Sequence, residues 1–194
     1  FTADETIDLL RRLDGDEDDR PWLTVCSFLN PHDIAYFGLV GLKEGLRYHP
    51  SQVPHVDQAP TRDEDLSTKP RCQQSTIDLW SRIWLPQPWI ETHLKFYYQV
   101  QATVDLQIAR VLDALAGSGA HEDTIVIFSS DHGDMQGAHG GFHEKWHNAY
   151  EETVRVPFVV SSPLLPQGAR ELDVPTSHAD LIPTVLGLAG VDPD

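Results

Sequence analysis

Long apolar runs are missing from the 194 residues of this chain. No stretch approaches the ~20 consecutive apolar residues that a membrane helix needs, and no basic segment followed by an apolar one opens the chain as a signal peptide would. We therefore expect no membrane partner. The chain begins at Phe1 and its only methionine is Met135, so we expect the N-terminus to be a cut, a processing site or a cloning boundary.

Basic residues are also scarce, since 14 Lys and Arg stand against 30 Asp and Glu, for a formal charge of -16. A field of this sign repels nucleic acid and anionic membranes, so we expect no nucleic-acid partner. A small anionic ester could still bind where a metal ion and one or two cationic side chains reverse the potential locally.

Cysteine is nearly absent. Cys26 and Cys72 have no metal-like spacing and make neither a disulfide framework nor a zinc knuckle. They leave the compartment open, cytoplasmic or periplasmic.

Three apolar runs predict buried strands, at residues 22–28 (WLTVCSF), 124–128 (TIVIF) and 156–160 (VPFVV). They do not alternate cleanly, which is typical of a sheet covered on both faces. The longest helical pattern, from Leu94 to Leu115, precedes the second run and stops at Gly117 and Gly119. Helix, short turn and strand in this order are half of a βαβ unit.

Two further segments complete this organisation. A helix is predicted from Leu181 to Ala189, with Asp180 as N-cap. Residues 36–92 are rich in Pro, His, Gln and charge, and predict a long irregular excursion, either at the rim of an active site or as a passive surface loop. Without internal repeats, residues 1–194 are one domain or part of one.

The most informative segment is TIVIFSSDHGD, in which Asp131 and His132 follow the second apolar run. Open α/β sheets bind ligands at the carboxyl ends of their strands. A carboxylate beside an imidazole suits manganese, zinc or iron, and with more carboxylates calcium. The pair alone would more often be a turn with a capping aspartate.

The loop that follows strengthens the metal interpretation. Glycines at 137, 140 and 141 allow it to bring four cationic or ligating side chains back to the same strand end: His139, His143, Lys145 and His147. A lysine can neutralise an oxyanion, and a histidine can bind metal or protonate a leaving oxygen. A histidine-rich surface loop is the alternative.

A second polar cluster, Asn30-Pro31-His32-Asp33, follows the first apolar run. Two strand ends of this kind can share one pocket. On its own the turn favours a structural interpretation, with Asp33 as a cap and His32 at the surface.

In combination and order these segments resemble the sulfatases of the alkaline-phosphatase superfamily, which include arylsulfatases, choline sulfatases and phosphonate monoester hydrolases. WLTVCSFLNPHD resembles the strand that ends in a substrate-binding histidine, and LKFYYQVQATVDLQIARVLDALAGSGAHEDTIVIFSSDHGD the helix and strand that lead to the metal pair. HGGFHEKWHNAYEETVRVPFVV is similar to the loop with the substrate-contacting lysine, and SHADLIPTVLGLAGV to the following helix.

The resemblance implies roles for individual residues. Asp131 and His132 would coordinate one divalent ion, and His32 and Lys145 would contact the sulfate or the leaving-group oxygen. Many relatives have asparagine at the position of His132 and hold calcium, whereas histidine resembles the branch that often uses manganese. The lysine loop is one residue longer than the commonest pattern, so His143 competes with Lys145 for the substrate-binding position.

The resemblance also implies an α/β/α sandwich with a mostly parallel sheet, of which this chain would be the C-terminal part. The family's nucleophile is a formylglycine made from a Cys/Ser-x-Pro-x-Arg motif, and neither Cys26 nor Cys72 fits that motif. We therefore expect a fragment that lacks its nucleophile and is inactive alone, with exposed apolar faces that need the missing N-terminal part or a second copy as cover.

The reaction expected of the intact protein is metal-dependent hydrolysis of sulfate esters. Hydrolysis of phosphodiesters or phosphonate monoesters is the alternative within the enzymes, and a non-catalytic remnant that binds anions is the alternative outside them.

Overall fold

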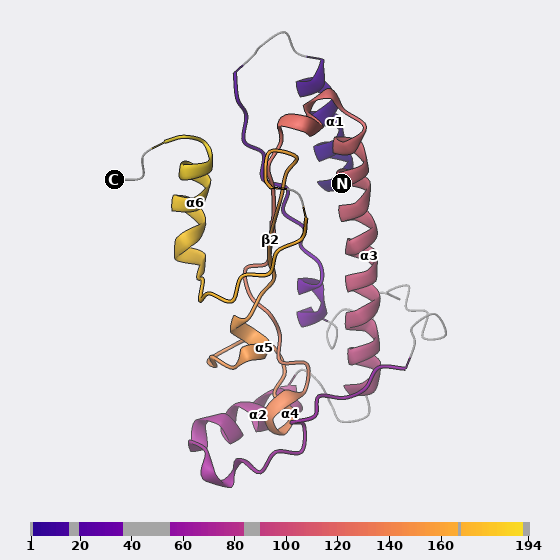
Figure 1. Ribbon diagram of the computed structural model, residues 1–194. Coiled ribbons are helices and arrows are strands. Elements are labelled where there is room, and N and C mark those ends of the chain that lie inside the picture. The colour runs from indigo at the N-terminus through magenta and orange to yellow at the C-terminus, as the bar shows by residue number, and fades with distance from the viewer. Residues whose placement is uncertain (1, 16–19, 37–54, 84–89, 167, 192–194) are drawn as a thin grey trace.

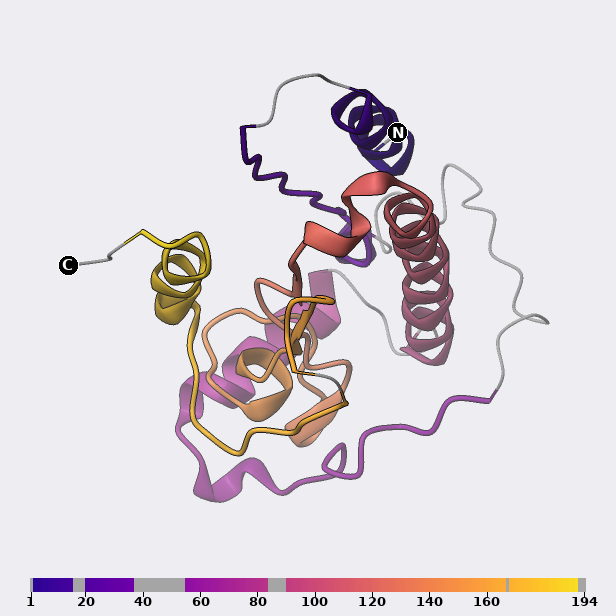
Figure 2. The same cartoon turned by 45° about the horizontal axis from the view of Figure 1, so that its top comes forward.

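The computed structural model describes residues 2–15, 20–36, 55–83, 90–166 and 168–191. Helix α3 (Ile90–Ala116) is the long element of the structure, and α1 (Thr2–Asp14) packs beside its C-terminal half (Figures 1 and 2). The predicted helix from Leu94 to Leu115 is therefore confirmed, and it begins four residues earlier than predicted.

Helix α1 is not among the elements predicted from the sequence, although its residues favour a helix. Asp4 and Glu5 stand in its first turn and its two arginines in the last turn, which suits the helix dipole. Its buried positions follow the helical period, at Ala3, Thr6, Ile7 and Leu10. An ion pair of 2.6 Å between Asp4 and Arg110 ties this helix to α3.

The sheet consists of two strands, β1 (Val126–Ser129) and β2 (Phe158–Ser161), near the second and third predicted runs. They pair antiparallel, with Val126 opposite Ser161 and Ser129 opposite Phe158. Within the described ranges the predicted mostly parallel sheet is therefore not seen, because the chain folds back on itself between these strands. Helices α3 and α6 (Leu181–Leu188) lie on opposite sides of this two-stranded sheet, called the ribbon below (Figures 1 and 2). This is an α/β arrangement.

The first predicted strand, at 22–28, is not a strand. It is a segment whose side chains alternate in exposure, with Leu23 and Val25 exposed and Thr24 and Cys26 half-buried. One edge faces α1, where the Thr6 hydroxyl donates to Cys26 Sγ at 3.2 Å. A strand needs a hydrogen-bonded neighbour, and no described segment provides one here.

The predicted irregular excursion at 36–92 contains regular elements. Residues 37–54 and 84–89 lie outside the described residues, but between them are η4 (Leu66–Thr68) and helix α2 (Arg71–Ile83). This part shares a core with the loop after β1, made of Leu66, Ile77, Met135, Ala138 and Phe142. The excursion is therefore packed against the segment that carries the predicted site residues.

Helix α6 begins where the sequence predicts, but its cap differs. Asp180 makes no cap bond for α6; its side chain instead accepts from the backbone N–H of Ser177 at 2.6 Å. Ser177 caps the preceding turn, η7 (His178–Asp180), in a capping box. Across the parts of the chain that the structure describes, no helix has the length and apolar content for a membrane crossing.

Candidate active site

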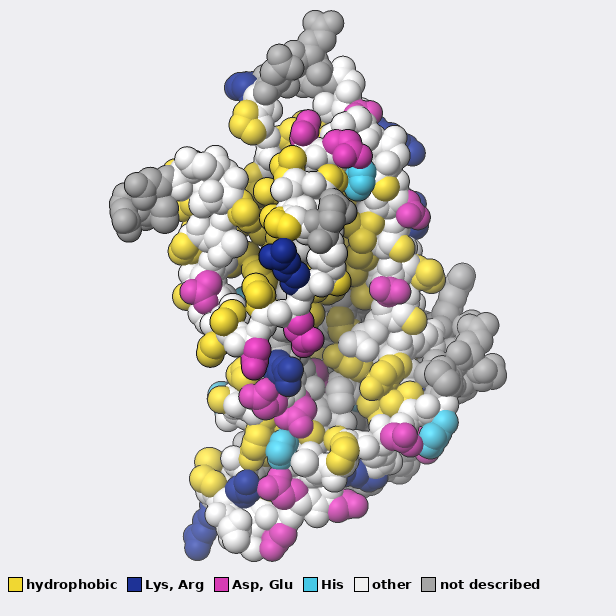
Figure 3. Space-filling view, in the orientation of Figure 1, with side chains coloured by type: hydrophobic (Ala, Val, Ile, Leu, Met, Phe, Trp, Pro, Cys, Tyr) yellow, Lys and Arg dark blue, Asp and Glu magenta, His cyan; other side chains and the backbone are white. Residues whose placement is uncertain are grey.

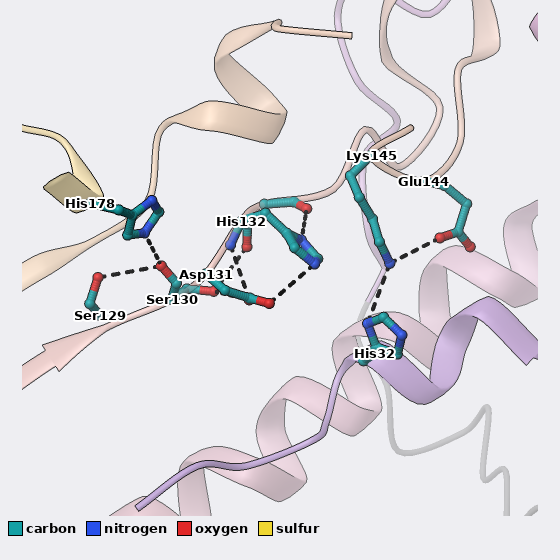
Figure 4. Close-up of polar contacts among 9 residues, drawn as sticks. His32, Ser129, Ser130, Asp131, His132, Glu144, Lys145 and His178 are labelled. Atoms are coloured by element: carbon teal, nitrogen blue, oxygen red, sulfur yellow. Dashed lines mark hydrogen bonds and ion pairs between the residues drawn. The ribbon is translucent and has the colours of Figure 1, made fainter. Parts of the chain in front are cut away.

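His32 is the first residue of the short turn η1 (His32–Tyr36), which packs on α3. The anchor of this turn is Ile34, which is 2% exposed and lies against Phe96 and Val100. Because Ile34 points into this apolar contact, the His32 ring stays at the surface and faces the loop after β1 (Figure 4).

Asp131 and His132 leave the end of β1 as predicted. The Asp131 side chain is 84% exposed, and its Oδ2 lies 3.4 Å from His132 Nε2. On the other side of the ring, His132 Nδ1 is 2.8 Å from the carbonyl oxygen of Gly133. A carbonyl only accepts, so Nδ1 carries the proton in the neutral ring and Nε2 presents its lone pair beside the carboxylate.

Gly133 explains the tight turn after this pair. Its N–H donates to the carbonyl oxygen of Thr153 at 2.8 Å, and a Cβ at residue 133 would collide with the carbonyl oxygen of Glu152. The backbone of α5 (Glu151–Val154) therefore lies directly against the metal-ligand candidates.

Lys145 reaches the same place from the far end of the loop. Its ammonium lies 3.4 Å from His32 Nδ1 and 3.3 Å from a carboxylate oxygen of Glu144. An ammonium has donors only, so His32 Nδ1 accepts and the neutral ring carries its proton on Nε2. The centroids of the His32 and His132 rings are 6.2 Å apart.

The structure thus brings four predicted residues into one cluster: His32, Asp131, His132 and Lys145 (Figure 4). They come from positions up to 113 residues apart in the chain. Their individual roles stay predictions, because geometry alone does not assign them.

His143, the competing candidate, has other neighbours. Its ring makes an edge contact with His93, at 5.4 Å between centroids, and neither of its nitrogens has a hydrogen-bond partner among the described residues. Burial first, and the nearby Arg62 charge second, lower the pKa of His143 to about 4. The ring is therefore neutral at physiological pH.

Sequence reasoning missed three contributors to the cluster. Glu144 is 5% exposed, and its carboxylate pairs with Lys145 from inside the protein. Asp134 lies near it, and His178 Nε2 is 2.8 Å from the carbonyl oxygen of Ser130. The adjacency of Glu144 to Lys145 in the sequence was the one signal available for these contacts.

Asp134 and Glu144 place two buried carboxyl groups near the Lys145 ammonium. Burial raises the pKa of Asp134 and of Glu144, and in Glu144 the Asp134 charge adds to this while Lys145 opposes it. Burial first, and then the charges of Asp134, Tyr98 and Glu144, raise the pKa of Tyr97 to about 12. A cation at residue 145 offsets the cost of holding negative charge at this depth.

Asp131 and His132 are two metal-ligand candidates, which is too few for a closed site. In the described part of the chain no group of three or more His, Cys, Asp or Glu side chains is placed to hold a metal ion.

Comparisons with known proteins identify the family of the chain. The sulfatase family model matches residues 1–191. An uncharacterized sulfatase of Escherichia coli (strain K12), YidJ, is 32% identical over 178 residues, which are 90% of this chain and 33% of that protein. The chain spans about a third of the length of the curated relatives it matches.

Solved structures of hydrolytic enzymes share the fold. A 2-O GAG sulfatase matches with a TM-score of 0.77 and 26% identity, over 100% of this chain and 42% of that chain. The phosphonate monoester hydrolase of Agrobacterium radiobacter matches with a TM-score of 0.69 and 31% identity, over 97% of this chain and 38% of that chain. The fold is thus that of part of an alkaline-phosphatase-type domain, and the chain belongs to the sulfatase family.

Proposed function

We propose that the complete protein hydrolyses a sulfate ester with the help of a divalent metal ion, and that this chain contributes two metal ligands and two substrate contacts. The observation that supports the proposal is a chain of neighbouring side chains: the Lys145 ammonium contacts the His32 ring, whose centroid lies 6.2 Å from that of His132, and His132 lies beside the Asp131 carboxylate. A cation, two imidazoles and a carboxylate in one cluster suit an anionic ester and a metal ion.

The metal ligands would be Asp131 and His132. The Gly133 carbonyl holds the proton of the His132 ring on Nδ1, so that Nε2 is the ligating atom and points toward the same side as the carboxylate. One imidazole with a carboxylate favours manganese over calcium, which prefers oxygen ligands only. The ion would supply charge stabilisation for the sulfate oxygens.

Lys145 and His32 divide the remaining work in this proposal. The Lys145 ammonium offsets negative charge on the sulfate oxygens. His32 uses its Nε2 proton to hydrogen-bond or protonate the alcohol oxygen as the bond from sulfur to oxygen breaks. Because Lys145 donates to Nδ1 of the same ring, it also selects the tautomer that His32 needs.

The nucleophile is assigned to another part of the protein. None of the 194 residues forms a Cys/Ser-x-Pro-x-Arg motif, and the relatives are about three times as long. A formylglycine in that other part is what the family resemblance implies. We expect the isolated 194-residue polypeptide to bind metal weakly and to turn over no sulfate ester, and measurable turnover by it would contradict this assignment.

The test is substitution in the complete enzyme. We expect His32→Ala and Lys145→Ala each to lower kcat/KM for an aryl sulfate by about 100-fold or more, as expected for a lost acid or charge-stabilising group. His121→Ala, in the turn η6 (Gly119–Asp123) after α3, is the matched control and should retain normal turnover. Activities of both site variants within a few-fold of the unchanged enzyme would refute the roles.

A second candidate function is hydrolysis of a phosphonate monoester or phosphodiester. It is favoured by the 31% identity to a phosphonate monoester hydrolase over 97% of this chain. Rates for an aryl sulfate and an aryl phosphonate monoester, measured side by side on the metal-loaded enzyme, separate the two. A phosphonate rate above the sulfate rate would replace the first proposal with the second.

A further inference from the structure

The loop that carries Lys145 has an unusual backbone. Four of its non-glycine residues have left-handed φ angles: 43° at Gln136, 48° at His139, 66° at Glu144 and 59° at His147. Each such residue costs free energy and persists only where its surroundings hold it in place. The position of Lys145 therefore depends on whatever holds this loop.

Part of the restraint is internal. The N–H of Gly137 donates to the carbonyl oxygen of Phe142 at 2.6 Å, and the N–H of Met135 donates to that of Glu144 at 3.2 Å. These bonds close the loop on itself, so a displacement at its tip is transmitted to residues 142–145.

The other part comes from the excursion. Thr61 makes two bonds to the tip of the loop: its hydroxyl accepts from the N–H of His139 at 3.1 Å, and its carbonyl oxygen accepts from the N–H of Gly140 at 3.1 Å. The Leu66 side chain fills the space beside Gly140, where a Cβ would lie 2.7 Å from it.

The His139 side chain is the centre of this contact. Its Nδ1 lies 2.6 Å from Glu64 and its Nε2 lies 3.3 Å from Glu152, while its ring stacks on Tyr150 at 3.9 Å between centroids. Lys69 holds the other oxygen of Glu64 at 3.1 Å. Only 18% of the His139 side chain is exposed.

We propose that His139 is a positioning residue: its contacts hold residues 59–69 against the loop that carries Lys145, and so keep Lys145 beside His32. We call this set of His139 contacts the clasp. The catalytic part of this inference rests on the proposed function; the structural part does not. The excursion is then a support for the active site rather than a passive surface loop. Glu64 hydrogen-bonds one ring nitrogen, and the Glu152 carboxylate, 88 residues away in the chain, lies within ion-pair distance of the other, an arrangement that a solvated histidine would not show.

The structural test is hydrogen exchange in the complete protein. His139→Asn suits the left-handed backbone, because asparagine tolerates it, but the shorter side chain cannot span the two carboxylates. We expect exchange of the amides at 137–145 to accelerate about tenfold or more, as for a local opening, without a comparable change in α3. Glu64→Gln should give a smaller acceleration at the same amides.

The matched control is His55→Asn. His55 is also a histidine of the excursion paired with a carboxylate, Asp57, but its side chain is 81% exposed. We expect exchange and turnover of this variant to equal those of the unchanged protein. Exchange at 137–145 that is the same in His139→Asn and the unchanged protein would overturn the clasp.

The catalytic test is a double-mutant cycle. If His139 acts through Lys145, His139→Asn lowers kcat about tenfold in the unchanged enzyme, changes KM less, and has no further effect on kcat in the Lys145→Ala background. Additive losses would show a merely structural role and overturn the positioning claim. If the unchanged enzyme hydrolyses no ester, the proposed function fails, and exchange still decides whether the clasp exists.

Discussion

At the scale of single residues, Gly133 is a position of the site where even the smallest side chain would collide with neighbouring backbone. It follows directly on Asp131 and His132, and its Cα lies against the backbone of Glu152 and Thr153. Backbone cannot move aside as a flexible side chain can. The metal-ligand candidates and α5 therefore share one close backbone contact.

We expect Gly133→Ala to lower the free energy of unfolding of the complete protein by at least about 2 kcal/mol, the cost typical of an overpacked site. Urea denaturation measures this. Gly117→Ala is the matched control, since a Cβ there would make ordinary contacts with carbonyl oxygens at 3.5 and 3.8 Å. Equal denaturation midpoints for the two variants would contradict the backbone clash.

At the scale of elements, the lysine loop meets α3 through the His93–His143 contact. Burial is the first cause that lowers the pKa of both rings, to about 3 for His93 and about 4 for His143. A proton on His143 would further oppose one on His93, and the Arg62 charge further opposes one on His143. The protonated form of either ring is therefore incompatible with this packing. Acid is expected to separate the loop from the helix.

The direction in which pH changes the folding stability follows from proton binding. His143 titrates near 6.5 when exposed and near 4 when folded, so between these values the unfolded chain holds a proton that the folded chain does not. Stability is then lost as the pH falls from 6.5 toward 4.

We expect His143→Phe to reduce the loss of stability between pH 7 and pH 4 by about 3 kcal/mol, from the size of the pKa shift. Urea unfolding at a series of pH values measures it. His55→Phe, at an exposed histidine, should leave the pH profile unchanged. A profile for His143→Phe that runs parallel to that of the unchanged protein would show that this ring does not govern acid stability.

At the scale of the whole molecule, the main feature is uncovered apolar surface. Apolar side chains gather on the face that carries the ribbon and α6 (Figure 3). Phe158, Val159 and Ile182 are among the exposed ones, and α6 is apolar in composition yet has no buried residue. A helix that is apolar on most of its sides normally lies inside a larger core.

We therefore expect the isolated 194-residue polypeptide to self-associate and to bind a hydrophobic dye, whereas the complete protein does neither to a comparable extent. Light scattering after size-exclusion chromatography gives the mass, and dye fluorescence reports the exposed surface. A dye-negative, monodisperse monomer of the isolated polypeptide would show that these faces need no cover.

Several elements of this structure could be predicted from short stretches of the sequence. The helical period identifies α3 between Leu94 and Leu115, and an apolar run followed by an acid and an imidazole identifies the end of β1. The helix and the strand end depend on residues close together in the chain, so the sequence by itself determined them. His32 and Lys145 were singled out by the resemblance to sulfatases, because the polar turn on its own favours a structural interpretation and the glycine-rich loop offers four candidate side chains.

Only the tertiary structure decided which distant segments and side chains contact one another. It shows that β1 and β2 pair antiparallel, that residues 22–28 form no ladder, and that His143 lies against His93. It also shows His139 between Glu64 and Glu152. Each of these depends on which distant segment packs alongside, and packing over such separations leaves no period or motif in the sequence, because it is set by burial and shape in three dimensions.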